Sequence, residues 1–206
     1  IKGSVEVLVA NGKPYQKVSE IANLFEVAFI VMGTNGEPEG LKGKFIGSNA
    51  LRVVRESKSP VITIKGKHHR SGCKNIVLPI DLTKETREKV NKAIEIAKLG
   101  SGAAIRVVSV LFTLDEFVVN RLTRQMSQVK RFVEKSGVEC TAEIIKSGKG
   151  EDSLGSNIIE YANKVEGDLL MIMTQQELGF TDFFVGSSAQ EIIHKSDIPV
   201  LSIVPE

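Results

Sequence analysis

A glycine-rich stretch offers the residue types and spacing best suited to binding an anion. Residues 33–47 read GTNGEPEGLKGKFIG; an apolar run precedes them and a short helical pattern follows. Glycines let the backbone approach an anion closely, while amides at the start of a helix point toward phosphates and the helix dipole favours negative charge. The stretch predicts a phosphate-binding loop, and a merely flexible connection is the other interpretation. The predicted contacts are Met32, Gly33, Thr34, Asn35, Gly36, Gly47, Ser48 and Asn49.

The same order of patterns returns near the end of the chain. Gly47 and Gly186 lie 139 residues apart, and Ala22 matches Ala162 at an offset of 140. Internal repeats of this kind indicate repeated structural units. The sequence therefore predicts two homologous domains in tandem.

The second copy of the loop has lost its leading glycines. Residues 173–176 read MTQQ in place of GTNG at 33–36, and nine residues then lead to Gly186. A methionine and two glutamines restrict φ and fill the space that a phosphate needs. Binding by Gly186, Ser187 and Ser188 is therefore predicted to be weak or absent.

Composition narrows the classes of protein. The chain of 206 residues is 42% hydrophobic and 25% charged, which is typical of a soluble protein with a packed core. Its 27 basic and 25 acidic residues are interspersed, so no basic stripe predicts a nucleic-acid partner. No apolar run approaches the roughly 18 residues that span a bilayer, so no membrane association is predicted. Two cysteines without framework spacing favour free thiols in the cytoplasm.

Other chemistry has little support in the sequence. His68, His69 and Cys73 lie in a basic, glycine-containing linker. Structural zinc sites need four closing ligands, and no fourth ligand is in sight, so these histidines are interpreted as solvated. The sequence shows no Walker lysine, no acidic metal pair beside the loop and no arrangement of nucleophile and base. No catalytic residue is predicted, and slow ATP hydrolysis is the most that we expect.

Hydrophobic patterning predicts alternating strands and helices. Alternating or continuous apolar runs predict strands, and apolar residues recurring every three or four positions predict helices. This alternation is typical of a doubly wound α/β fold with parallel strands and right-handed crossovers. The expected strands are residues 5–10, 27–32, 61–64, 76–80, 104–111, 138–145, 169–173 and 200–204, and the expected helices are 15–25, 48–54, 82–97, 115–135, 152–163 and 187–195.

Over essentially its whole length the chain resembles the universal stress protein family. The residues that carry the resemblance are Gly33-Thr34-Asn35-Gly36, Gly47-Ser48, Ser59-Pro60-Val61-Ile62, Pro79-Ile80-Asp81, Gly186-Ser187 and Ile198-Pro199-Val200-Leu201. The family's loop has nine residues between its second glycine and the Gly-Ser pair, whereas ten separate Gly36 from Gly47 here. Loops tolerate such insertions.

The resemblance implies a fold and a ligand. The fold is a Rossmann-like, five-stranded parallel sheet of strand order 3-2-1-4-5, repeated in two tandem units. The ligand is an adenine nucleotide such as ATP, with Mg²⁺, bound at the first loop. Asp81 stands where nucleotide-binding members hold an acidic residue near the nucleoside, although it also reads as an ordinary aspartate at a helix start. Members associate through their fifth strands, which predicts either a homodimer or a pseudo-dimer within one chain, with residues 61–64 against 200–204.

The same strand order predicts a missing segment. The first unit supplies only strands 3, 4 and 5, and strand 3 would lie too far from strand 4 to pair with it. We therefore expect a strand-helix-strand-helix segment before Ile1, as part of the same protein. The predicted division is residues 1–65 for the C-terminal half of the first domain, 66–74 for a linker and 75–206 for a complete second domain.

Two functions remain open at this point. The first is a cytoplasmic stress-response protein that binds an adenine nucleotide through the first loop. The second is a nucleotide-free module that binds protein partners of unknown identity. The replaced glycines at 173–176 favour the second function, as do Phe180, Phe183 and Phe184 if they are exposed.

Overall fold

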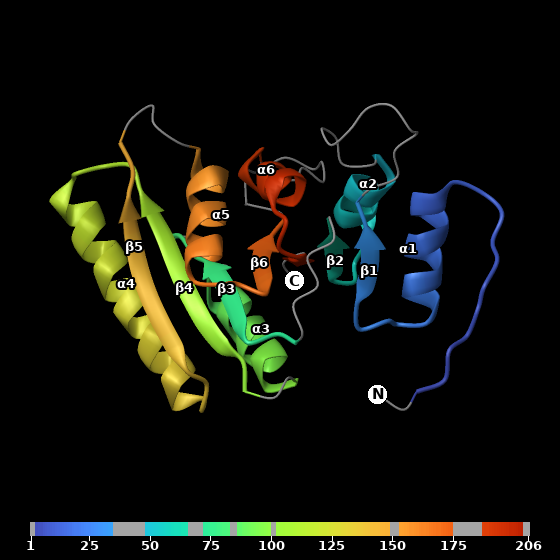
Figure 1. Cartoon of the computed structure of the whole chain (residues 1–206), viewed down its shortest axis with the longest axis horizontal. Coiled ribbons are helices and arrows are strands. Elements are labelled where there is room, and N and C mark those ends of the chain that lie inside the picture. Colours follow the sequence, from blue (N-terminus) through green and yellow to red (C-terminus); the bar gives the residue numbers. More distant parts are fainter. Residues whose placement is uncertain are drawn as a thin grey trace.

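The computed structural model describes residues 3–34, 48–65, 72–82, 86–99, 102–148, 153–174 and 187–203. Its elements are helices and strands that alternate along the chain (Figure 1). The helices are α1 (Pro14–Leu24), α2 (Ser48–Glu56), α3 (Thr86–Leu99), α4 (Glu116–Lys135), α5 (Leu154–Lys164) and α6 (Ser187–Lys195). The strands are β1 (Ile30–Gly33), β2 (Val61–Ile64), β3 (Asn75–Pro79), β4 (Ala104–Leu111), β5 (Cys140–Lys146), β6 (Leu169–Met173) and β7 (Val200–Ile203).

The strands form one sheet in the order β1-β2-β7-β6-β3-β4-β5. Strands β3 to β7 are parallel to their neighbours, and counted along the chain their order is 3-2-1-4-5, as predicted. Strands β1 and β2 form a second parallel pair. The two sets meet where β2 runs antiparallel to β7, with Ile62 opposite Leu201. The predicted pairing of fifth strands therefore occurs within the chain.

Helices cover the sheet in two layers. Helices α3 and α4 pack on one face, where their apolar residues join those of β3, β4 and β6. Helices α1, α2, α5 and α6 pack on the other face, against residues from all the central strands. In Figure 1 α1 lies at one end of the molecule, and α4 and β5 lie at the other.

Local signals account for the best-defined elements. In α4, the side chain of Asp115 caps the helix by accepting hydrogen bonds from the Phe117 and Val118 amides. The buried stripe of α4 consists of the predicted Leu122, Met126, Val129 and Val133. All five residues of β6 are buried, as expected for a central parallel strand covered on both faces.

Three predictions at the start of the chain are wrong. Residues 5–10 form no strand, and Val9 is 95% exposed, because no described strand lies beside them and a lone strand leaves its backbone groups unpaired. The strand predicted at 27–32 starts at Ile30, because Glu26 takes a positive φ of 48° and Val27 donates to Ala22 O in the turn that ends α1. Strand β1 is covered on only one face, since Val31 is exposed.

Other boundaries differ by a few residues. Ser153 is the N-cap of α5, so this helix begins at Leu154 rather than at residue 152. Strand β5 begins at Cys140 rather than at residue 138. The predicted start of α3 at Leu82-Thr83 falls partly outside the described residues, and Thr86 is the first residue of the helix that the structure describes.

The internal repeat is visible in hydrogen bonds. Ser57 Oγ and Ser196 Oγ each donate to a carbonyl two residues onward, at 3.0 and 2.8 Å, in the turns before β2 and β7. Glu26 and Glu166 both take positive φ values, 48° and 52°, in the turns before β1 and β6. Matching turns at an offset of about 140 residues indicate that the two units share one local fold.

The contact between paired helices differs between the units. In the first unit, the Arg52 guanidinium of α2 lies 4.8 Å from the centre of the Tyr15 ring of α1. In the second unit Glu191, at the position that matches Arg52, accepts hydrogen bonds from Ser153 Oγ at 2.6 Å and Lys195 Nζ at 2.6 Å. Burial alone would raise the pKa of Glu191, but these hydrogen bonds and one from Ser156 outweigh it and hold the pKa below its ordinary value.

A matched pair of substitutions tests the join between the units. Thr63 Oγ1 donates to Val200 O across the β2–β7 pair at 3.3 Å. Its counterpart, Ser202 Oγ, is buried without a hydrogen-bond partner among the described residues. Thr63→Val should lower the free energy of unfolding by about 1 kcal/mol, whereas Ser202→Ala should leave it unchanged or raise it. Urea denaturation measures both, and equal losses in the two variants would contradict this assignment.

Candidate functional site

The described part of the predicted loop lies at the carboxyl end of β1. Gly33 ends this strand and is exposed, and a Cβ added to it would meet no atom within 4 Å. Helix α2 then begins at Ser48, with Asn49 half-buried in its first turn. The predicted Asn35, Gly36 and Gly47 lie outside the described residues. The end of β1 and the start of α2 thus border open space beside Gly33.

Thr34 anchors the start of the loop. Its amide donates to Ile64 O at 2.9 Å, and its hydroxyl donates to the same oxygen at 3.3 Å. The side chain is buried, so its only hydroxyl proton is engaged within the protein. Thr174 makes the same two bonds to Ile203 O, at 3.0 and 3.2 Å. These threonines tie the ends of neighbouring strands together, and the sequence gave no sign of this role.

The matching position in the second unit is filled. Met173 stands where the first unit has Gly33, and it is only 8% exposed. Its side chain belongs to the apolar cluster under α3 and α4. Ser187, the first residue of α6, is exposed and Ser188 is half-buried, whereas Gly186 lies outside the described residues. One copy of the site is therefore open at its first residue, and the other is closed by a core side chain.

Asp81 belongs to the second unit and not to the open site. It follows β3, and its backbone carbonyl accepts hydrogen bonds from Thr86 Oγ1 at 3.0 Å and Gln125 Nε2 at 2.8 Å. Strands β2, β7 and β6 lie between β3 and β1. The predicted residues are therefore divided between two places in the sheet. Met32, Gly33, Thr34, Ser48 and Asn49 lie in one unit, and Asp81, Ser187 and Ser188 lie in the other.

A cavity beside α4 was not predicted from the sequence. Its volume is about 650 Å³. Phe117 is 74% exposed at its edge, and two arginines but no carboxylate are among its lining residues. The spacing of its α4 residues would have indicated one helix face, although that face is polar and reads as ordinary solvated surface. The lining residues are Leu82, Phe117, Asn120, Arg121, Arg124, Gln125 and Gln128.

Both cysteines are free thiols with little tendency to ionise. Burial raises the pKa of Cys73, and the nearby Asp168 carboxylate raises it further. Burial also raises the pKa of Cys140, to about 11. A metal binds the thiolate, so both sites disfavour it. Within the described ranges no three His, Cys, Asp or Glu side chains gather to hold a metal ion, and His68 and His69 lie outside those ranges.

No helix in the described part of the chain is long and apolar enough to cross a bilayer.

Comparisons with known proteins all point in one direction. A model of the family described as "Universal stress protein family" matches residues 1–65 and 72–203. A universal stress protein of Methanocaldococcus jannaschii is 27% identical over 143 residues, which cover 63% of this chain and 81% of that protein. A solved universal stress protein from Archaeoglobus fulgidus superposes with a TM-score of 0.71 at 19% identity; the match covers 94% of this chain but only 66% of that one.

Another structure carries a ligand in its description. It is the universal stress protein from Archaeoglobus fulgidus in complex with dAMP, with a TM-score of 0.50 and 22% identity, covering 65% of this chain and 98% of that one. At these identities the structural matches establish a shared fold.

The open and filled positions can be compared directly by substitution. Gly33→Ala places a methyl group in open space, so the free energy of unfolding should change by no more than about 0.5 kcal/mol. Met173→Ala empties a buried position, so it should lower that free energy by about 2–5 kcal/mol. Chemical denaturation measures both values. A large loss in Gly33→Ala would show that the end of β1 is closed.

Proposed function

Because the chain belongs to the universal stress protein family, we propose that it is a stress-response protein that binds an adenine nucleotide at the turn between β1 and α2. The observation that carries this proposal is the open space beside Gly33, set against the buried Met173 at the matching position. A phosphate needs backbone amides that it can reach without meeting a side chain. Only the first unit offers this at the end of its strand.

The residues at this turn fit the phosphate part of the ligand. Helix α2 spans nine residues, and the amides of its first turn carry the positive end of its dipole. Ser48 and Asn49 stand at this end of the helix. ATP with Mg²⁺ is the form of nucleotide that we propose, and the dAMP complex of a family member supports the adenine nucleotide class.

The proposal includes a division of labour between two tandem units. Residues 1–65 and 75–206 are the two units, joined by residues 66–74, and the repeated turns before β1 and β6 support this division. The second unit keeps Asp81 but has its loop start filled by Met173, so we assign nucleotide binding to the first unit. A cytoplasmic location is part of the same proposal, and the two free thiols support it.

Nucleotide binding is tested by thermal unfolding with and without ATP and Mg²⁺. A ligand at 100 times its Kd adds about 2.7 kcal/mol to the stability of the folded state, and for a domain of this size this raises the Tm by about 5–10 °C. Gly33→Val should abolish the rise, because its side chain fills the space beside the phosphates. Met173→Leu, a volume-conserving change in the second unit, should keep it. The absence of any rise at millimolar ATP in the unaltered chain would contradict the proposal.

A nucleotide-free protein-interaction module is the second candidate, and the cavity beside α4 favours it. Phe117 and Leu114 expose large apolar side chains next to Arg121 and Arg124. Exposed aromatic and arginine side chains are enriched at protein interfaces. Such a surface would take an acidic segment of a partner that carries apolar residues.

The two candidates separate in a complementation experiment. Cells that lack the gene would be supplied with Gly33→Val or with the double variant Phe117→Ser, Arg124→Glu, and their survival of stress would be measured. Loss of survival with Gly33→Val alone supports nucleotide binding, and loss with the double variant alone supports the interaction module. Each variant must first keep the Tm of the unaltered protein. Full survival with both variants would exclude both candidates.

A further inference from the structure

Strand β1 has a free edge. Among the described strands it pairs only with β2, whereas its repeat counterpart β6 lies between β7 and β3. The Ile30 and Thr34 amides donate to Pro60 O and Ile64 O on the β2 side. Because successive residues of a strand point their backbone groups to opposite sides, the Val31 and Gly33 amides lie on the other edge. That edge presents donors and acceptors to whatever lies beside it.

The face of the sheet next to this edge is also uncovered. Val31 is 62% exposed, whereas its counterpart Met171 is 0% exposed. Met171 belongs to the cluster that α3 closes. The two residues occupy equivalent places in equivalent strands, so the difference comes from what packs on them. Val31 lies where the second unit has a covering helix.

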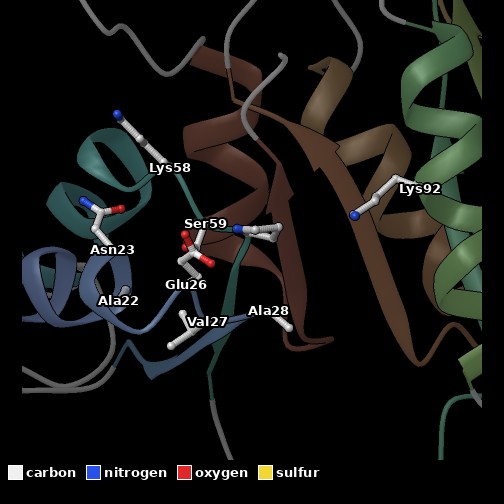
Figure 2. Close-up of a pocket in the computed structure, with 9 residues that line it drawn as sticks. Ala22, Asn23, Glu26, Val27, Ala28, Lys58, Ser59 and Lys92 are labelled. Carbon is white, nitrogen blue, oxygen red and sulfur yellow. The ribbon is translucent and has the colours of Figure 1, made fainter.

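A cavity of about 390 Å³ marks the start of the free edge (Figure 2). Glu26, Val27 and Ala28, which lead into β1, line it, and Lys92 faces them from the other side of the opening. The matching residues of the second unit hold the start of β3. Asp168 Oδ2 accepts hydrogen bonds from the Lys74 and Asn75 amides, each at 2.8 Å.

From these three observations we propose that the free edge of β1 is a docking site for a parallel strand followed by a helix, built like β3 and α3. The strand would pair with the outward groups of Val31 and Gly33, and the helix would cover Val31. The internal repeat supplies the template, since β3 and α3 do this for β6 in the same chain.

The docking site selects its strand by size. A Cβ at Gly167 would lie 2.7 Å from Val77 Cγ2, so the second unit needs glycine there to accept the valine of β3. The first unit has Val27 at that position. The incoming strand must therefore carry glycine or alanine where β3 carries Val77. Ala28 in place of Asp168 likewise removes the carboxylate that holds the first two amides of β3.

The occupant that we propose belongs to a longer form of the same polypeptide. The similar structure from Archaeoglobus fulgidus aligns with 94% of this chain, yet a third of its own length lies outside the match. An edge that continues an existing sheet is completed most simply by strands of the same fold, and unpaired edges otherwise invite aggregation. A second copy of this chain is the rival occupant.

The test joins a copy of residues 74–99 to the start of the chain through a flexible Gly/Ser linker, which gives a high effective concentration. The copy is made either unchanged or with Val77→Gly, and each is joined to the unaltered chain or to the Val27→Gly variant. Hydrogen exchange of the Val31 and Gly33 amides and the Tm are measured for all four proteins. The two chains without any added copy serve as references.

We expect a reciprocal pattern. On the unaltered chain only the Val77→Gly copy should slow exchange at Val31 and Gly33, by about tenfold or more, and raise the Tm. On the Val27→Gly chain the unchanged copy should do so as well. Equal protection by both copies on both chains, or protection by neither, would overturn the inference. So would a dimer of the unextended chain in which these two amides are already protected, because the edge would then belong to a second copy.

Discussion

The antiparallel pairing of β2 with β7 is the interaction on which the rest of the structure depends. Ile62 lies opposite Leu201, and Val61 and Thr63 lie opposite Ser202 and Val200. Because Leu201 is the repeat counterpart of Ile62, this register places the two units symmetrically about the pair. A slip of one residue would turn the buried side chains of both strands to the wrong face. The pairing thus fixes both the sheet and the two helix layers that depend on it.

This pairing also gives the first unit its core. Val53, Val54 and Val61 belong to the same apolar cluster as Leu170, Ile192 and Val200 of the second unit. A pair of short parallel strands with two helices has little apolar surface to bury by itself, and small units of this kind are marginal. The site at Gly33 therefore stands on a unit whose stability comes largely from its neighbour. It remains open because nothing in that neighbour reaches the end of β1.

The sequence predicted elements well where the local pattern and the final environment agree. Strands 61–64, 104–111 and 169–173 and helix 187–195 have the predicted bounds, because continuous apolar runs and helical stripes reflect real burial. Residues 5–10 are equally rich in β-branched side chains and yet form no strand, because a strand requires a partner and propensity cannot supply one. Of the site, the glycine pattern indicated the loop. The openness at Gly33, the internal bonds of Thr34 and the separation of Asp81 depend on contacts between distant segments, which no local pattern contains.

The open site and the free edge are two views of one asymmetry. In the second unit, β3 lies beside β6 and ends at Asp81, while β6 ends at the buried Met173. In the first unit β1 ends at the open Gly33, and its free edge is the place that a strand like β3 would occupy. A strand docked there would end beside the nucleotide turn, where an acidic residue could contact the nucleoside. Ligand and strand would then bind the same folded form, and thermodynamic linkage requires each to strengthen the binding of the other. The glycine that opens the turn and the valine that selects the strand thus act on one equilibrium.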